Sequence, residues 1–269
     1  MRKKFVLGVI GAGFMSTAII NGILNAKILK KNQIFVSDRN DDAIDKMRKL
    51  GVKTTKDNFE VAENSNYLLF AIKPQNFDEV AILLKDIKVP TIISIMAGVK
   101  ISKIKKYFKY SKVVRCMPNT PCSIGYGAVG IDMSDLTDEK DIKFVNETFN
   151  SFAKVSYVKE EEIGAVTGVS GSSPAYFYYF IKSIVESGVK HGLNYETALN
   201  LATNTMIGAG KMIQSSKDKS LDELINAVCS KGGTTIQAIN TFNDLNLSDI
   251  IDKAITACIN RSKELEDKL

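Results

Sequence analysis

The chain has 269 residues, of which 45% are hydrophobic and 25% charged, and its formal net charge is +6 at pH 7. These values exclude a disordered chain and allow one large domain or two moderate ones. The single histidine, His191, excludes a multi-histidine metal site, and the four cysteines contain no C-x-x-C pair, so we expect no metal.

The chain opens with basic residues and an apolar run over residues 5–10, which imitates a signal peptide. The run is short and breaks at Gly11, so it predicts a buried first strand instead. No later stretch reaches the roughly 18 apolar residues of a membrane span. The lysines of residues 100–112 surround an apolar stripe of Ile101, Ile104 and Phe108, which favours a solvated helix face beside a core stripe over a nucleic-acid surface. We therefore expect a cytoplasmic protein that binds neither membrane nor nucleic acid.

Short apolar, β-rich runs alternate with amphipathic helices through the first 158 residues. The alternation predicts an α/β fold, in which an N-terminal doubly wound, Rossmann-type domain carries a mostly parallel sheet. The predicted strands are 5–10, 34–37, 67–72, 91–95, 113–117 and 153–157, and the predicted helices are 18–26, 41–50, 77–85, 101–108 and 139–150.

Only helical patterns follow residue 160, over 174–189, 195–213, 221–228, 235–242 and 248–265. Ser220 and Glu223 form a capping box, and Ser172 or Ser173 is the expected N-cap before Pro174. Residues 175–181 are apolar or aromatic on all sides, so other helices must cover them. We predict a dinucleotide-binding domain over 1–160 and an all-α dimerisation and substrate domain over 161–269, in a homo-oligomer built from dimers.

A glycine-rich motif over residues 8–16 follows the first predicted strand and opens a helix, which is the context of the dinucleotide fingerprint. Gly11 permits the tight turn, and Gly13 lets the backbone approach a pyrophosphate at the positive end of the helix. Phe14 and Met15 begin that helix and are further predicted cofactor contacts.

Ser37, Asp38 and Arg39 lie at the end of the second predicted strand, at the position that contacts the adenosine ribose in dinucleotide-binding folds. An aspartate there accepts hydrogen bonds from the ribose of NAD, whereas an arginine binds the 2′-phosphate of NADP. Both residues are present, so this motif does not settle the choice of cofactor. We expect NADP(H) as the preferred cofactor, and NAD(H) stays open.

Three further loops carry residues that are candidates for contacting the cofactor or the substrate. Residues 70–75 should border the nicotinamide ribose, and in residues 114–121 Asn119 is a candidate partner of the nicotinamide amide. Residues 229–235 form a glycine-rich loop before a helix, which suits a small carboxylate. From this loop alone, an ordinary interhelical turn is the favoured explanation.

Five motifs together resemble the pyrroline-5-carboxylate reductase family, in the order seen in that family, and residues 260–265 resemble its last helix. The motifs are residues 8–16, 71–74, 115–121, 166–176 and 232–235. The family usually has glycine at the position of Ser173 and proline at that of Lys231. The resemblance implies hydride transfer from NAD(P)H to 1-pyrroline-5-carboxylate, which gives proline in the last step of its biosynthesis.

The resemblance also implies individual roles. Thr235 would hydrogen-bond the ring nitrogen as the catalytic contact, and the substrate carboxylate would be held by Ser230, Gly232, Gly233 and Thr234. Further cofactor contacts would be Asn58, Ala71, Lys73, Pro74, Met96, Ala97 and Gly98. Since a protonated imine is already a good hydride acceptor, we expect no side chain to be indispensable for proton transfer.

Other functions stay open beside this one. The β-hydroxyacid dehydrogenases place a catalytic lysine where this chain has Phe177, which disfavours alcohol oxidation. A reductase of a different cyclic imine and a non-catalytic NAD(P)-binding protein remain as alternatives.

Overall fold

The computed structural model describes residues 3–268, so part of the basic run before the first strand lies outside it. The chain forms two compact units. Unit 1 consists of the residues up to Pro174 together with those from Cys258 onward, and unit 2 is Ala175–Ala257. The predicted boundary after residue 160 rests on the sequence pattern and stays a prediction.

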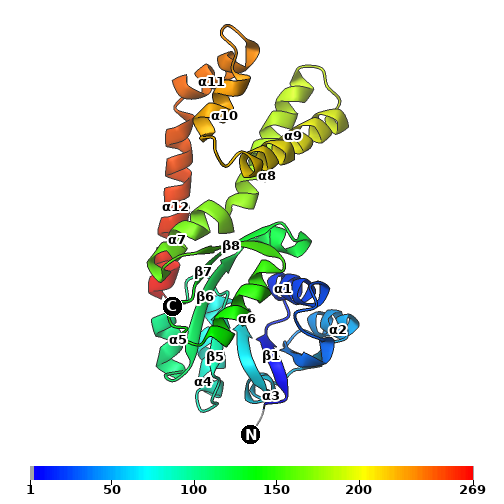
Figure 1. The fold of residues 1–269 in the computed structure, drawn as a ribbon, viewed down its shortest axis with the longest axis vertical. Helices are drawn as coiled ribbons and strands as arrows, with labels where there is room; N and C mark the ends of the chain where they lie inside the picture. The colour runs from blue at the N-terminus through cyan, green and yellow to red at the C-terminus, as the bar shows by residue number, and fades with distance from the viewer. Residues whose placement is uncertain (1–2, 269) are drawn as a thin grey trace. The chain divides into compact units, whose positions relative to one another are not determined.

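Unit 1 is built on an eight-stranded sheet in the order β3-β2-β1-β4-β5-β6-β7-β8 (Figure 1). Neighbouring strands are parallel except β6 and β7, so the sheet is mostly parallel, as predicted. The strands are β1 (Phe5–Ile10), β2 (Ile34–Ser37), β3 (Lys53–Thr55), β4 (Ser65–Phe70), β5 (Thr91–Ser94), β6 (Lys112–Pro118), β7 (Gly127–Asp132) and β8 (Ala153–Tyr157).

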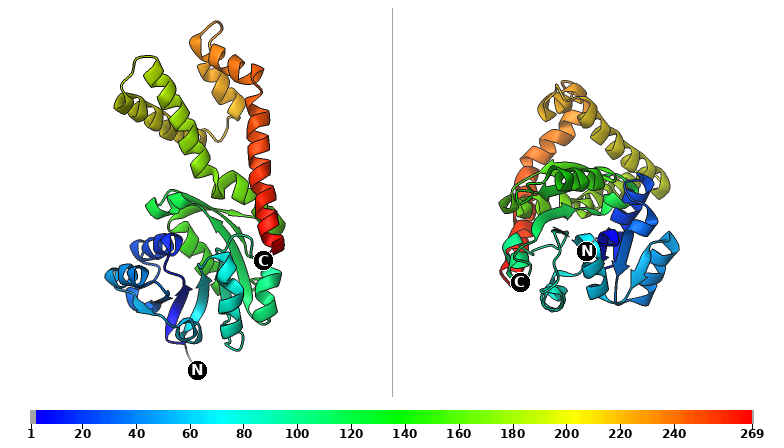
Figure 2. Two further views of the ribbon diagram at one scale, coloured as in Figure 1. Left: turned by 180° about the vertical axis from the view of Figure 1, so that it is seen from behind. Right: turned by 60° about the horizontal axis from the view of Figure 1, so that its bottom comes forward.

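Helices cover both faces of this sheet because successive strand residues point to opposite sides. Leu7 and Val9 of β1 join the core of one face, and Phe5 and Ile10 join the core of the other. Figure 2 shows the sheet from behind. The first face packs against α1 (Phe14–Asn25), α2 (Asp41–Leu50) and α6 (Glu139–Asn150), and the second against α3 (Asn58–Asn64), α4 (Phe77–Leu84) and α5 (Ile101–Tyr107). This is the predicted doubly wound arrangement.

Two strands of the sheet and the helix that joins β3 to β4 escaped the sequence analysis. β3 is a polar, three-residue edge strand, and β7 carries two glycines, which weaken a strand pattern. α3 has only seven residues and begins at Asp57, whose carboxylate caps the Phe59 N–H at 2.8 Å. Each of these elements is therefore held mainly by its neighbours in the sheet.

Beyond Tyr157 the described residues contain helices and no strand, as predicted. Unit 2 holds most of α8 (Ser173–Lys190), all of α9 (Tyr195–Ser215), α10 (Leu221–Val228) and α11 (Thr234–Asp244), and the start of α12 (Leu247–Lys268). The Ser220–Glu223 capping box is confirmed. None of the described helices is long and apolar enough to cross a membrane.

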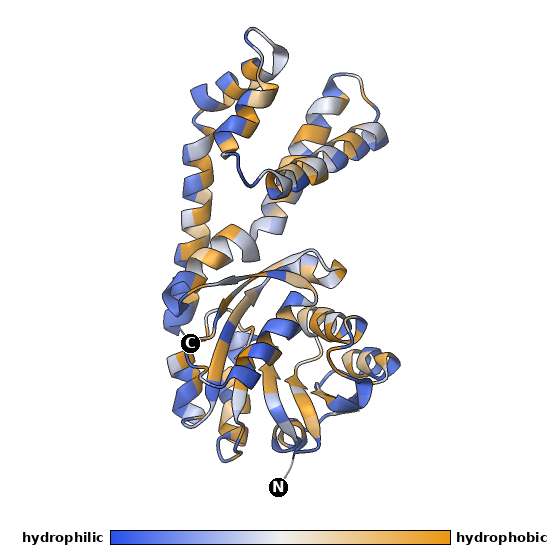
Figure 3. Ribbon diagram, viewed as in Figure 1, coloured by the Kyte–Doolittle hydropathy of each residue, from blue (hydrophilic) through white to orange (hydrophobic). Residues whose placement is uncertain are grey.

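Unit 2 has a small core of its own, formed by Val185, Ala198 and Ala202. Its helices nevertheless carry many apolar residues, drawn orange in Figure 3. Tyr178 and Tyr179 of α8 are 65% and 72% exposed. The apolar segment over 175–181 is therefore not fully covered by other helices of this chain, and its predicted cover by a partner subunit stays a prediction.

The predicted N-cap at Ser172 or Ser173 is wrong. α7 (Ile163–Val166) runs into a π-helical segment, Thr167–Gly171, which we call the π-turn, and α8 already begins at Ser173. The Ser173 hydroxyl donates backwards, to the carbonyl oxygens of Gly168 and Val169. The prediction failed because a helix precedes Pro174, where the serine-proline pattern suggested a loop.

Candidate active site

The C-terminal ends of the parallel strands meet at one edge of the sheet in unit 1. The last residues of β1, β2, β4 and β5 form a row, in which Ile10 pairs with Ser37 and Phe70, and Phe70 with Ser94, while Ser94 pairs with Arg115 inside β6. The predicted cofactor residues lie at the strand ends on this side of the sheet, in the loops that follow, or in the first turn of the next helix. Ligands of open α/β sheets bind at such an edge, which we call the cofactor edge.

The loop between β1 and α1 has the shape that a pyrophosphate needs. Gly11 has φ +102°, and a Cβ there would stand 2.6 Å from the carbonyl oxygen of Ala71. Gly13 is the N-cap of α1, with no side-chain cap and open space within 4 Å of its Cβ position. The first N–H groups of α1 are thus left for an anion, and the residues present fit a dinucleotide.

Asp38 turns into this loop. Its carboxylate accepts hydrogen bonds from the Ala12 N–H at 2.6 Å and from the Asn40 N–H at 2.9 Å. Arg39 is exposed, and its contact with Glu79, at 3.7 Å, is a surface ion pair of little strength. Both oxygens of Asp38 therefore already hold backbone groups, while the Arg39 guanidinium remains accessible.

The ends of β2 and β5 carry serines with partners inside the protein. Ser37 donates to Asn58 Oδ1 at 2.7 Å, so both of these predicted cofactor residues meet beside the adenosine position. Ser94 accepts from the Met96 N–H at 3.3 Å. Met96 is buried and Ala97 exposed, so among these neighbours Ala97 presents its side chain at the edge.

Four predicted contacts lie after β4 and β5. Ala71 donates its N–H to Ile10 at 2.9 Å, which fixes the start of this loop against β1. Lys73 is exposed and precedes a short 3₁₀ turn that Pro74 opens. Gly98 has φ +75°, so the chain turns sharply there.

Asn119 follows β6 at the same edge, and both ends of its amide are occupied. Oδ1 accepts from the Ala128 N–H at 3.0 Å, and Nδ2 lies 3.3 Å from both the carbonyl oxygen and the hydroxyl of Ser170. The residue is 9% exposed. A nicotinamide contact by Asn119 stays a prediction, and the structure gives its amide other partners.

Two cysteines of the same segment are buried thiols. Burial raises the pKa of Cys116 well above its ordinary value, and the charge of Asp132 adds to this effect. Burial also raises the pKa of Cys122. A thiol with a raised pKa is a poor nucleophile, so neither residue suits covalent catalysis.

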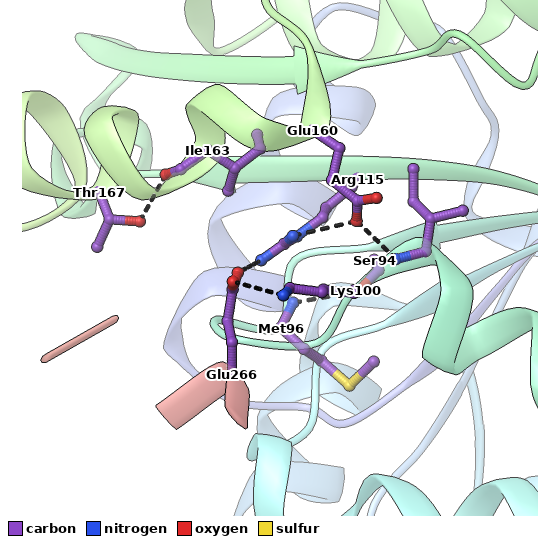
Figure 4. A network of polar contacts seen from close by, with 9 residues as sticks. Ser94, Met96, Lys100, Arg115, Glu160, Ile163, Thr167 and Glu266 are labelled. Atoms are coloured by element: carbon purple, nitrogen blue, oxygen red, sulfur yellow. Dashed lines mark hydrogen bonds and ion pairs between the residues drawn. The ribbon is translucent and has the colours of Figure 1, made fainter. Parts of the chain in front are cut away.

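The sequence analysis missed a charged cluster below the edge, shown in Figure 4 and here called the Arg115 network. Arg115 is 1% exposed and pairs with Glu160 at 3.1 Å and with Glu266 of α12. Lys100 lies 3.6 Å from Glu266, and Glu160 accepts from the Ile101 N–H at 2.6 Å. Because Glu160 and Glu266 are distant in sequence, only the fold reveals that they share one guanidinium.

The candidate carboxylate loop belongs to unit 2. Gly232 has φ +73°, Gly233 caps α11 without a side-chain hydrogen bond, and the Gly233 N–H bonds Ser230 at 2.9 Å. Thr234 and Thr235 are exposed in the first turn of α11. The loop thus offers backbone N–H groups at the N-terminus of an 11-residue helix. No cluster of histidine, cysteine or acidic residues suited to a metal occurs among residues 3–268.

Known proteins match the chain along its whole length. A family model described as pyrroline-5-carboxylate reductase dimerisation matches residues 160–265, and one for NADP oxidoreductases, coenzyme F420-dependent, matches residues 6–98. A pyrroline-5-carboxylate reductase of Staphylococcus aureus is 34% identical over 262 residues, which are 96% of each chain.

Two solved structures agree with this match. A pyrroline-5-carboxylate reductase of Coxiella burnetii has a TM-score of 0.88 and 34% identity over 98% of this chain and 99% of its own. The pyrroline carboxylate reductase of Plasmodium falciparum, with NADP bound, has a TM-score of 0.84 and 29% identity over 99% of this chain and all of its own.

Proposed function

Because the chain belongs to the pyrroline-5-carboxylate reductase family, we propose that it reduces 1-pyrroline-5-carboxylate to proline with a hydride from NAD(P)H. The observation that carries this proposal is the cofactor edge. Its loop at Gly11 and Gly13 suits a pyrophosphate, as hydride transfer from a dinucleotide requires.

We propose NADPH as the preferred cofactor. Both carboxylate oxygens of Asp38 accept backbone N–H groups, so this residue is less available to a ribose diol than its position suggests. Arg39 is exposed beside it and suits a 2′-phosphate. The NADP in the Plasmodium falciparum relative supports the same preference. NADH remains a usable second cofactor in this proposal.

The remaining cofactor contacts follow the edge. Phe14 and Met15 open α1 over the pyrophosphate, and the half-buried Asn58 lies near the adenosine ribose. Ala71, Lys73 and Pro74 border the central part of the cofactor, with Met96, Ala97 and Gly98 next along the edge. Bound cofactor supplies the hydride, which adds to C5 of the protonated imine, while the ring nitrogen keeps its proton as the amine of proline.

The substrate contacts come from the loop before α11. We propose that the loop holds the substrate carboxylate through the backbone N–H groups of Gly232 and Thr234 and the hydroxyl of Ser230, while the Gly233 N–H, bonded to the Ser230 carbonyl, fixes the shape of the loop. The Thr235 hydroxyl accepts the N–H of the ring. These residues orient the ring and leave its nitrogen charged, which favours hydride addition without a general acid.

A homodimer or a larger assembly of dimers completes the proposed protein. Unit 2 leaves large apolar side chains exposed, with Tyr178 and Tyr179 more than half exposed, and the dimerisation family model spans this part of the chain. In this proposal residues 161–269 form the dimerisation and substrate domain, residues 1–160 bind the cofactor, and the enzyme works in the cytoplasm.

The test is oxidation of NADPH and of NADH by the purified protein, followed through the absorbance of the reduced cofactor, with and without 1-pyrroline-5-carboxylate. We expect imine-dependent oxidation and a higher kcat/KM with NADPH. Arg39→Ala should reduce the NADPH value by about tenfold and leave the NADH value nearly unchanged. Cofactor binding without imine-dependent oxidation would contradict the reductase proposal.

A further inference from the structure

The helical segment that leads into α8 is interrupted where it meets the cofactor edge. The Ser172 N–H bonds the carbonyl of Thr167, five residues back, at 2.9 Å, which is the π-helical pattern. Pro174 follows and has no N–H, so it cannot donate to the carbonyl of Ser170, four residues before it. Such turns are frequent at functional sites. Carbonyls of the π-turn therefore need side-chain donors in place of backbone N–H groups.

Two side chains supply these donors. Asn119 Nδ2 lies 3.3 Å from the Ser170 carbonyl oxygen and also 3.3 Å from its hydroxyl. The Ser173 hydroxyl lies 3.2 Å from the Gly168 carbonyl oxygen and donates to Val169 as well. Since Ser173 is 6% exposed, its hydroxyl contacts the turn and not a bound molecule.

We propose that Asn119 and Ser173 act together as positioning residues, which hold the π-turn as a fixed wall of the imine site. This inference rests on the proposed reductase function. Asn119 follows β6 at the cofactor edge, so the turn bonded to it borders the same edge. The turn exposes the apolar side chain of Val169, which is 63% exposed and suits an apolar ring. Fixing this wall restricts where the imine ring can lie.

Direct contact between Asn119 and the nicotinamide is the competing explanation. In that case Asn119 acts on the cofactor and Ser173 has no kinetic role, since it is buried in the helix. If the two residues instead work through one turn, their variants should share one phenotype. Their effects should also overlap in the double variant, because both remove support from the same structure.

The experiment compares Asn119→Asp, Ser173→Ala, the double variant and Ser173→Thr, which keeps the hydroxyl. Ser151→Ala is a matched control, since its hydroxyl also bonds a backbone carbonyl, that of Thr148 at 2.6 Å, away from the turn. For each protein kcat and KM for 1-pyrroline-5-carboxylate are measured, and the Kd for NADPH is taken from cofactor fluorescence.

We expect each single variant to lower kcat/KM for the imine by about tenfold, below the roughly 100-fold that a 1 Å misplacement can cause. The Kd for NADPH should change by less than about twofold, because the adenosine half binds at the other end of the edge. The double variant should be little worse than either single one, and Ser173→Thr and Ser151→Ala should resemble the wild type. A Ser173→Ala enzyme with wild-type kinetics, or fully additive effects, would overturn the proposal.

Hydrogen–deuterium exchange separates this inference from the reductase assignment, since it requires no turnover. Amides of residues 163–173 should exchange about tenfold faster in Ser173→Ala and Asn119→Asp than in the wild type, and those of β1 should not change. Unchanged exchange in the turn would refute the inference even in an active enzyme. A wild type that fails to reduce the imine would refute the reductase function instead.

Discussion

Gly11→Ala should destabilise the protein far more than an alanine at another left-handed glycine. Gly11 has φ +102°, and an alanine Cβ would meet the carbonyl oxygen of Ala71 at 2.6 Å and its carbon at 2.8 Å. Positive φ costs an alanine about 1–2 kcal/mol. Displacing a backbone carbonyl that borders two paired strands adds about 1–3 kcal/mol. We therefore expect a loss of about 2–5 kcal/mol in the free energy of unfolding.

Gly125→Ala is the matched control, because Gly125 has φ +77° and no atom within 4 Å of its Cβ position. It should lose only the conformational part, about 1–2 kcal/mol. Urea unfolding is followed by far-ultraviolet circular dichroism, since the chain has no tryptophan. Gly11→Ala should also weaken NADPH binding by more than about tenfold, as the loop is displaced. Equal stability losses in the two variants would show that the contact with Ala71 has no energetic effect.

Three further variants test other parts of the structure. Thr235→Ala should lower kcat/KM for the imine by about tenfold without abolishing turnover, and Thr235→Ser should restore it; complete inactivity of folded Thr235→Ala would show an essential hydroxyl. Arg115→Met should cost about 3–5 kcal/mol, because it leaves carboxylates of the Arg115 network without their guanidinium, whereas the exposed Arg48→Met should cost less than about 1 kcal/mol in the same urea assay. The hydrogen bond from Lys103 lowers the pKa of Asp78 below 3.8 in the folded protein. The ionised Asp78 therefore stabilises the fold above pH 3.8, and this stabilisation is lost as the pH falls through the folded pKa. Thermal melts down to about pH 3 should therefore show a shallower acid loss for Asp78→Asn, and an unchanged curve would contradict the stabilising role.

The architecture of unit 1 followed from the sequence because its central strands are apolar on both faces. β1 and β2 were predicted with their observed bounds, and each is almost wholly buried. A strand that is buried on both faces is a nearly continuous apolar run, so its composition alone predicts it. β3 and β7 could not be predicted in this way, because their residues form strands only through pairing with neighbours.

The candidate site was predictable in position and less so in role. Asp38 and Asn119 lie directly after β2 and β6, as the sequence predicted, while their contacts with a cofactor stay predictions. A motif does not show what a side chain bonds to, however. Here the Asp38 carboxylate bonds the Ala12 N–H, and the Asn119 amide bonds the Ser170 carbonyl, although both side chains were predicted to contact ligands. Partners so distant in sequence become visible only when the chain has folded.

A common pattern at the cofactor edge connects the fold to the chemistry. Ser37, Ser94, Asp38 and Asn119 all lie at or just after strand ends, and each has a hydrogen-bond partner within the protein. Their side chains fix loops, so in the proposed function the ligands are bound by backbone groups and by a few other side chains, such as Arg39 and Thr235. A ketone reductase could not work in this way, because its oxygen needs a proton donor in the transition state. A protonated imine carries its proton already, so fixed geometry can provide most of the catalysis.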